Sequence, residues 1–150
     1  MTWFYRGNEL EDEHIPSKAV GFVYLMVHKP TGQRYIGRKL LTKAVRRQKN
    51  KKIIKSRTES DWREYWSSSP EILKIIEEHG TDVFTREVLV FANNKSELNY
   101  MEECLQYSLG VLEDEGWINS NIRSKAFRKH IFGKEPIQQM RELIRNLLNN

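Results

Sequence analysis

Cysteine is almost absent from this 150-residue sequence, and no apolar run approaches the roughly 20 residues that a membrane-spanning helix needs. The single cysteine, Cys104, cannot form an internal disulfide, which excludes a disulfide scaffold. The four histidines do not share the spacing of zinc ligands, so a zinc finger is excluded as well. No basic leader followed by an apolar stretch begins the sequence, and we therefore expect a cytoplasmic protein.

Acidic residues are also missing from one stretch, Arg38 to Arg57, which we call the basic segment. Its ten basic residues are Arg38, Lys39, Lys43, Arg46, Arg47, Lys49, Lys51, Lys52, Lys55 and Arg57. The rest of the chain has 15 basic and 20 acidic residues, so the positive charge is concentrated in one place. Such a concentration indicates a site for a nucleic-acid backbone, and the alternative is a solvated loop without a partner.

What is present is typical of a single domain that contains both strands and helices. Hydrophobic residues make up 39% of the sequence and charged residues 30%, and the length suffices for one buried core. We expect strands over residues 21–28, 33–37 and 84–92, because these segments are short and rich in β-branched and aromatic residues. The turn residues 30–32 join the first two strands as a hairpin.

Four segments are predicted to be helical: residues 40–48, residues 70–80, a segment from the caps at 93–96 to about 109 or 112, and the segment that begins at Pro136. The second of these has the clearest boundaries. Ser69 and Pro70 are typical of a helix start, and Gly80 is typical of a helix end. The first 20 residues are expected to form an irregular arm.

Two tyrosines lie on the predicted hairpin, in Phe22-Val23-Tyr24 and in Tyr35-Ile36-Gly37. Because 24 and 35 sum to an odd number, a hairpin loop with an even number of residues places both phenols on one face of the sheet. Tyrosine is a common strand residue, so the alternative is a pair of core or rim side chains without a chemical role.

These two tripeptides, and the basic segment after them, resemble the signature of the GIY-YIG nuclease family. The resemblance is closest to small phage-type members, in which the second motif continues as in Gly37-Arg38-Lys39. Further segments fit the same group in chain order: Ser60-Asp61-Trp62, Tyr65-Trp66-Ser67-Ser68, Phe84 to Leu89, and Tyr100-Met101-Glu102. Together they extend from about residue 21 to residue 119.

The resemblance implies an α/β domain of the α+β type, with a three-stranded antiparallel sheet flanked by helices and an extra C-terminal helix. It divides the chain into an N-terminal arm (1–20), a nuclease domain (21–122) with a basic insertion at about 40–68, and a C-terminal helical extension (123–150). It also implies a DNA endonuclease that hydrolyses phosphodiester bonds with one divalent cation, Mg²⁺ or Mn²⁺. If a phage encodes the protein, it would act in the host cytoplasm.

Helix geometry favours one carboxylate as a metal ligand. The expected buried stripe of the helix after residue 96 consists of Leu98, Met101, Leu105, Leu109 and Leu112. Glu102 lies on the flank of this stripe, about 60° from its centre, whereas Glu103 points into solvent. A flanking carboxylate reaches a cleft while it still contacts water, as a Mg²⁺ ligand requires, and the resemblance implies the same role for Glu102. The alternative is an ordinary flank residue.

The resemblance further implies that Tyr24 acts as the general base for the attacking water and that Tyr35 orients the water or the phosphate. A phenol has an unperturbed pKa near 10, so nearby cations must stabilise the phenolate at neutral pH. The candidates are Arg38, Lys39 and Arg46.

Two further site residues depend on alignment with the family pattern. The family's arginine position holds Val45 here, so we favour Arg46 for that role, with Arg38 and then Lys39 as substitutes. The late asparagine of the family corresponds to Asn119, which would hydrogen-bond a tyrosine or a phosphate. The alternative is that Asn119 is a turn residue without a role in the site.

Other functions stay open at this point. The basic segment 38–57 is compatible with a non-catalytic nucleic-acid-binding module, but such a module does not need Tyr24, Tyr35 and Glu102 together. The aromatic residues between 62 and 66 favour a packed cluster over base stacking. A third class, an inhibitor or assembly protein, would use the apolar stripe of the last helix, which also suits an intramolecular core or a homo-oligomer. This stripe consists of Ile137, Met140, Leu143, Ile144, Leu147 and Leu148.

Overall fold

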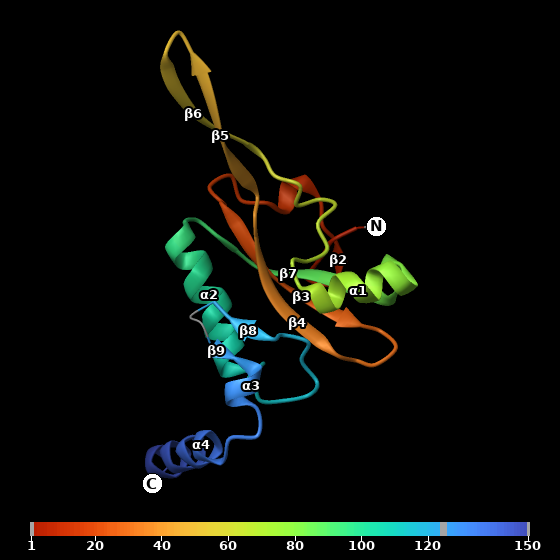
Figure 1. Ribbon diagram of the computed structural model, residues 1–150, viewed down its shortest axis with the longest axis vertical. Helices are drawn as coiled ribbons and strands as arrows, with labels where there is room; N and C mark the ends of the chain where they lie inside the picture. The colour runs from red at the N-terminus through yellow and green to blue at the C-terminus, as the bar shows by residue number, and fades with distance from the viewer. Residues whose placement is uncertain (1, 124–125, 150) are drawn as a thin grey trace.

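The computed structural model describes residues 2–123 and 126–149. The strands are β1 (Phe4–Tyr5), β2 (Asn8–Glu9), β3 (Gly21–His28), β4 (Arg34–Leu40), β5 (Thr42–Lys49), β6 (Lys52–Glu59), β7 (Phe84–Ala92), β8 (Asn121–Ile122) and β9 (Ala126–Phe127). The helices are α1 (Pro70–His79), α2 (Lys95–Ser108), α3 (Arg128–Ile131) and α4 (Glu135–Leu148), with short 3-10 helices at Asp12–His14 and Thr81–Val83. Figure 1 shows their arrangement.

The central sheet has five strands in the order β2-β1-β7-β3-β4, so the expectation of three strands is wrong. The three long strands β7, β3 and β4 are antiparallel neighbours, as the sequence predicts. The additional strands come from the N-terminal arm, where β1 pairs in parallel with β7 and β2 pairs with β1. The arm is therefore not irregular, and buried Trp3 anchors it to the core.

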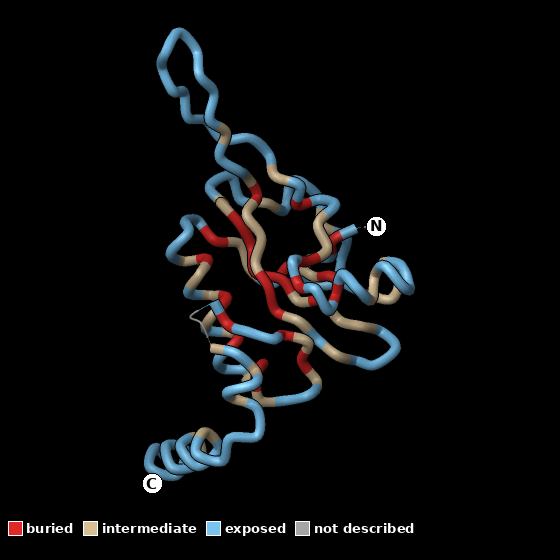
Figure 2. Tube along the Cα trace, in the orientation of Figure 1, coloured by how far each residue is buried: buried red, intermediate tan, exposed pale blue. Residues whose placement is uncertain are grey.

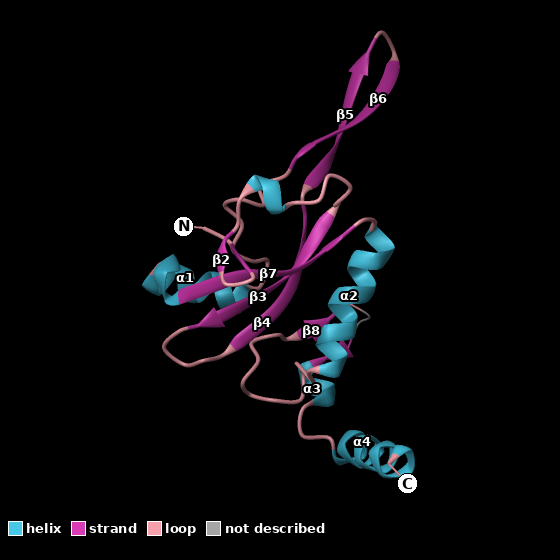
Figure 3. Ribbon diagram, turned by 180° about the vertical axis from the view of Figure 1, so that it is seen from behind, coloured by secondary structure: helices cyan, strands magenta, loops and turns pink. Residues whose placement is uncertain are grey.

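Both faces of the sheet are covered, which explains why β3 is apolar at nearly every position. Phe22, Tyr24 and Met26 belong to a core cluster on one face, next to α1 and the loop before it. Val23 and the buried Leu98 of α2 belong to a second cluster on the other face. Successive side chains of a strand point to opposite faces, so β3 contributes to both clusters. In Figure 3, α2 and α1 lie on different sides of the sheet.

Helices α1 and α2 follow the predicted signals. The Ser69 side chain accepts a hydrogen bond from the backbone N–H of Ile72, and Gly80 ends α1 with a φ of 80°. The Asn94 side chain caps α2 by accepting from the backbone N–H of Glu97. Leu98 is fully buried as expected, but α2 ends at Ser108 and Leu109 is exposed.

The predicted helix over residues 40–48 is wrong, because this part of the basic segment forms a β-hairpin. Strands β5 and β6 pair along their full length, from Thr42 opposite Glu59 to Lys49 opposite Lys52. They form a separate two-stranded sheet, which we call the basic ribbon (residues 42–59). It projects from the end of β4, and almost its whole length is exposed (Figure 2).

The last helix begins at Glu135, one residue before the predicted position. Its apolar stripe does not form an intramolecular core, because Met140, Leu143 and Leu147 are each at least 60% exposed. Arg141 attaches the helix to the body through an ion pair with Glu113, with 2.7 Å between Nη2 and Oε2. Across the described residues, no helix has both the length and the apolar character needed to cross a bilayer.

Candidate active site

The two tyrosines lie on the same face of the sheet, as the hairpin argument predicts. Tyr24 on β3 pairs with Gly37 on β4, and Tyr35 is two positions from Gly37 on the same strand. The ring centroids of Tyr24 and Tyr35 are 6.2 Å apart. A Cβ atom at Gly37 would lie 2.5 Å from the Tyr24 hydroxyl and 2.8 Å from the Tyr35 ring. Glycine is therefore required at this position so that both rings can pack against β4.

A cleft of about 390 Å³ lies at the edge of the sheet, along β4. Its lining residues are Tyr24, Tyr35, Arg38, Lys39, Leu40, Ser68, Glu102, Gln106, Asn121 and Arg123. The alternation of β4 directs Tyr35 and Lys39 to the face of α1, and Arg38 to the face of α2. The cleft thus extends around the strand edge and brings phenols from one face next to the Arg38–Glu102 pair of the other.

The outer edge of β4 is covered in its first half only. Residues 116–119 run along this half, with hydrogen bonds that join Arg34 to Gly116 and Ile118. The Asn119 amide then donates to the carbonyl oxygen of Ile36 and accepts from its N–H, at 2.9 and 3.1 Å. The cleft opens beyond Ile36, where these hydrogen bonds end.

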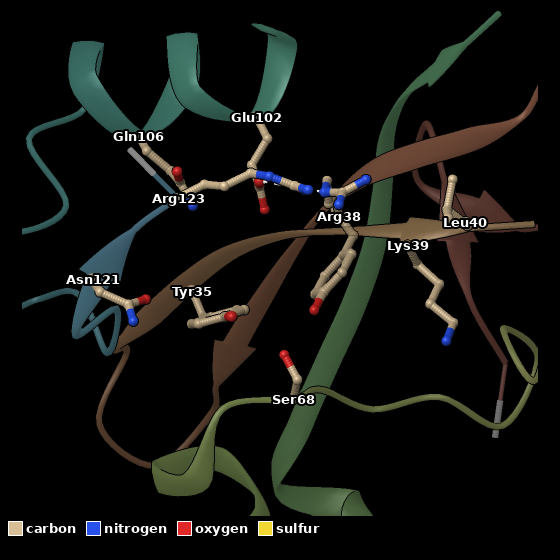
Figure 4. Close-up of a pocket in the computed structure, with 10 residues that line it drawn as sticks. Tyr35, Arg38, Lys39, Leu40, Ser68, Glu102, Gln106, Asn121 and Arg123 are labelled. Atoms are coloured by element: carbon tan, nitrogen blue, oxygen red, sulfur yellow. Dashed lines mark ion pairs between the residues drawn. The ribbon is translucent and has the colours of Figure 1, made fainter. Parts of the chain in front are cut away.

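Glu102 and Arg38 face each other across the cleft (Figure 4), with 3.8 Å between Arg38 Nε and Glu102 Oε1. Glu102 is only 8% exposed. Burial, and to a smaller extent the charge of Glu103, raise the pKa of Glu102 from its ordinary value to about 7. The Nη1 atom of Arg38 is buried without a hydrogen-bond partner, so this guanidinium retains a donor for an anion that enters the cleft.

Ser67 connects the two tyrosines from the loop before α1. Its buried hydroxyl forms hydrogen bonds with the side chains of both Tyr24 and Tyr35 and favours their ionised forms. Burial acts in the opposite direction and dominates. It raises the pKa of Tyr35 to about 12, and burial together with the neighbouring phenols raises the pKa of Tyr24 well above its usual value.

Arg86 holds the Ser67 loop against the sheet. This β7 residue is 2% exposed, and its guanidinium donates to the backbone carbonyl oxygens of Tyr65 and Arg63. It also packs against the rings of Trp3 and Trp66, at 4.6 and 4.1 Å from their centroids. Burial lowers the pKa of Arg86 to about 10, which still leaves it charged at neutral pH.

Lys39 lies on the phenol side of the cleft, but its charge has other partners. Its Nζ atom is 2.6 Å from an Asp61 carboxylate oxygen and 4.0 Å from the centroid of the Tyr65 ring. Lys39 is therefore engaged by other groups, whereas Arg38 keeps a buried donor without a hydrogen-bond partner.

The structure brings together five of the seven predicted site residues: Tyr24, Tyr35, Arg38, Lys39 and Glu102. Arg46 is not among them, because it lies exposed on β5 in the basic ribbon. Asn119 is buried outside the cleft lining, and its amide bonds the backbone of Ile36 instead of a tyrosine or a phosphate group. Of the aromatic residues between 62 and 66, Trp62 is buried in the core, so the packed-cluster interpretation is confirmed for it.

Sequence reasoning missed the remaining polar residues of the cleft, which are Ser68, Gln106, Asn121 and Arg123. Gln106 follows Glu102 by four residues, so helical spacing alone was a usable signal for it. Asn121 and Arg123 come from a segment without a periodic pattern, and only the fold places them there. Ser67 was part of a matching motif but had no assigned role.

The comparison with protein families agrees with this geometry. The family model described as "Putative endonuclease segE, GIY-YIG domain" matches residues 3–122, which is most of the chain. Residues 3–122 therefore form a GIY-YIG endonuclease domain. Within that class, the chain belongs to the segE family. Comparison with curated proteins and with solved structures finds no match.

Proposed function

We propose that this protein is a DNA endonuclease that hydrolyses phosphodiester bonds in the cleft along β4. The observation that supports this most strongly is that Tyr24, Tyr35, Arg38 and Glu102 line one cleft although they come from three separate elements. A protein that only binds DNA has no need of a buried carboxylate and two buried phenols at such a place.

The donor set of the cleft fits Mg²⁺ or Mn²⁺. Magnesium commonly uses one or two carboxylates and completes its coordination with water and substrate phosphate. Glu102 supplies one carboxylate, and no group of three or more His, Cys, Asp or Glu gathers in the part of the chain that the structure describes, the cleft included. Water and substrate phosphate would therefore complete the coordination. A cation bound through Glu102 would supply positive charge to the phosphoryl oxygens and favour ionisation of a bound water.

The chain's own residues account for binding of the phosphate and for activation of the attacking water. Arg38 binds the scissile phosphate through the guanidinium nitrogen that has no protein partner. Tyr24 accepts the proton of the attacking water, and Tyr35 orients that water or the phosphate. Because burial raises the pKa of Tyr24, this role requires positive charge beside the phenol, and Arg38 and Lys39 line the same cleft. The cations of the basic segment from Lys43 onwards bind the DNA backbone outside the cleft.

A cleavage assay tests this function. Purified protein is incubated with supercoiled plasmid, single-stranded DNA and RNA, each with Mg²⁺, Mn²⁺ or a chelator. We expect nicking of the plasmid with either metal, none with chelator, and at least a 100-fold loss in Tyr24→Phe. Tyr100→Phe is the matched control, since Tyr100 is 74% exposed and lies outside the cleft lining. A protein that binds DNA and never cuts it would instead be the non-catalytic binding module.

A further inference from the structure

We propose that the basic ribbon enters the major groove of duplex DNA and contacts base edges there through Ile53 and Ile54. The proposal rests on the proposed function for DNA as the substrate. It specifies in addition that this DNA is a duplex and that the basic ribbon is the surface that binds it. B-DNA has a major groove about 12 Å wide, which admits a two-stranded β-ribbon.

The basic ribbon is built as an independent element. Its strands pair in register over eight positions without a bulge, and its sheet contains only β5 and β6. Residues 46–59 are all exposed, so the distal part does not pack against the body. An isolated hairpin is marginally stable in water, and this one gains no hydrophobic support from the rest of the chain.

The placement of positive charges destabilises the basic ribbon. Lys49 pairs directly with Lys52, and Arg46 pairs directly with Lys55. Like charges at directly opposite positions of an antiparallel pair destabilise it. No ion pair to a carboxylate is found for these four residues among the described parts of the chain. A polyanion removes this repulsion, so binding DNA stabilises the ribbon.

The cations lie on both faces of the basic ribbon. Directly paired residues share a face, so Arg46 and Lys55 lie on one face, and Lys49 and Lys52 on the other. A ribbon that lies on a charged surface needs cations on one side only. Cations on both sides suit an element flanked by two phosphate backbones, as in a groove.

The tip of the basic ribbon carries apolar side chains where solvent alone would favour polar ones. Ile53 and Ile54 are 60% and 48% exposed and follow the turn at Asn50-Lys51. Both turn residues have positive φ, at 51° and 63°, as in the two-residue turns that suit a twisted hairpin. Because they are successive residues, Ile53 and Ile54 project from opposite faces of the ribbon. In the major groove, each exposed isoleucine side chain can contact the methyl group of a thymine on its own side.

Composition of the basic ribbon favours duplex DNA over other nucleic acids. Single strands are held largely by base stacking on aromatic side chains, and residues 42–59 include no aromatic residue. The major groove of duplex RNA is too narrow and deep for side chains to read. The test must therefore distinguish binding to single strands and to duplex RNA from binding to duplex DNA.

The basic ribbon is connected directly to the strand that forms the cleft. Only Leu41 separates β4, which carries Arg38 and Lys39, from β5. Eight extended residues span about 26 Å, so the tip reaches at most about eight base pairs from the cleft. We therefore expect the protein to protect the major groove within one helical turn of the cut.

The first test measures binding to a labelled duplex of about three helical turns, ~30 base pairs, with a chelator present so that no cleavage interferes. Lys49→Ala/Lys51→Ala/Lys52→Ala is compared with the charge-matched control Lys18→Ala/Lys74→Ala/Lys95→Ala, in which all three lysines are exposed and lie outside the ribbon. We expect the ribbon variant to lose at least about 10-fold in affinity, with a shallower salt dependence, and the control to lose less than about 2-fold. Equal losses in the two variants would overturn the proposal.

The second test addresses the groove. Uracil replaces thymine in the duplex, which removes the methyl groups and keeps the pairing. We expect wild-type protein to bind the uracil duplex at least about 3-fold more weakly, and Ile53→Ser/Ile54→Ser to bind both duplexes equally. Equal wild-type affinity for the two duplexes, or tighter binding to single-stranded DNA or duplex RNA, contradicts the proposal. Plasmid nicking is scored separately, so that ribbon-dependent binding without cleavage refutes the proposed function alone, and cleavage with ribbon-independent binding refutes this inference alone.

Discussion

Glu102 is a carboxylate held where its charge is disfavoured, and this determines how the candidate site responds to pH. Burial raises its pKa to about 7, so near neutral pH the metal-free carboxyl is partly protonated. A metal ion binds only the ionised form. Under the proposed function, Glu102 therefore links proton binding, metal binding and catalysis.

The rate of cleavage should follow the ionisation of Glu102. Below pH 7 the group is increasingly protonated and cannot hold the metal, so at low Mg²⁺ its ionisation should contribute about tenfold per pH unit to the rate. Above about pH 7 this contribution should end, and only the ionisation of Tyr24 should still raise the rate. Higher Mg²⁺ should move the midpoint to lower pH, because metal competes with the proton. Cleavage rates over pH 5.5 to 8.5 at two metal concentrations measure this. A profile independent of metal concentration would contradict the assignment.

The raised pKa also predicts a stability effect with a defined sign. The folded protein holds the Glu102 proton up to about pH 7, whereas the unfolded chain releases it near the ordinary carboxyl pKa of 4.5. Stability from this group is therefore present below pH 4.5 and is lost as pH rises to 7, by up to about 3 kcal/mol. Without metal at pH 8, Glu102→Gln should unfold at a higher temperature than wild type, and the two should converge near pH 5.

Ser67 should tune the tyrosines without contacting the substrate itself. Its hydrogen bonds lower the pKa of Tyr24 and Tyr35, so Ser67→Ala should raise both values further. We expect cleavage near neutral pH to fall about tenfold and ultraviolet titration to show ionisation of the buried phenols at higher pH. Ser17→Ala, at an exposed position far along the chain, is the control and should change neither. Unchanged phenol titration in Ser67→Ala would remove Ser67 from the account.

At the scale of elements, the sequence predicts best those strands and helices whose bounds depend on residues a few positions away. Strands β3 and β7 and helix α1 match the expected bounds to within one residue, because alternation, turn residues and capping act within a few positions. The strands of the arm were missed because two-residue strands exist only through pairing with β7, about 80 positions away. The sequence predicts a helix over residues 40–48, which includes most of β5, because lysine, arginine and glutamine favour helices and no buried face imposes alternation.

The candidate site likewise contains residues that local sequence predicts and residues whose role depends on distant segments. The motifs located Tyr24, Tyr35 and Glu102, and helix geometry independently favoured Glu102 over Glu103. The choice among the cations failed for Arg46 because it assumed a helix in the basic segment. Asn119 supports the edge of β4, a role that depends on packing between distant segments.

The loop that carries Ser67 should depend on buried Arg86. In Arg86→Met the carbonyl oxygens of Tyr65 and Arg63 lose their donor, and we expect a loss of about 2 to 4 kcal/mol in the free energy of unfolding. The control is Arg63→Met, since the Arg63 side chain forms exposed ion pairs and packs on the Trp62 ring, and these contacts should contribute less than about 1 kcal/mol. Urea unfolding measures both. Equal stability of the two variants would show that Arg86 does not hold the loop.

At the scale of the whole molecule, the features divide into a compact body with the cleft and two projecting elements, the basic ribbon and α4 (Figure 1). The family match ends at residue 122, before α4. The ribbon adds cations to the body, and α4 adds an exposed apolar stripe. Homo-oligomerisation through α4 stays a prediction.

That prediction has a direct test in solution. If α4 pairs with a second copy, wild-type protein at micromolar concentration should sediment as a dimer, because pairing removes the exposed stripe from water. Met140→Glu/Leu147→Glu should then sediment as a monomer, and Gln138→Glu/Gln139→Glu should not, since these glutamines lie on the same helix outside the stripe. A monomeric wild type would remove oligomerisation from the account.

The central claim is that the cleft along β4 cuts DNA through Glu102, and nicking of supercoiled plasmid by two matched variants tests it most directly. Glu102→Gln and Glu103→Gln change adjacent residues of α2 in the same way, but only Glu102 lines the cleft. We predict that Glu103→Gln nicks at the wild-type rate and that Glu102→Gln binds the plasmid normally and nicks at least about 100-fold more slowly. Wild-type nicking by Glu102→Gln would contradict the account.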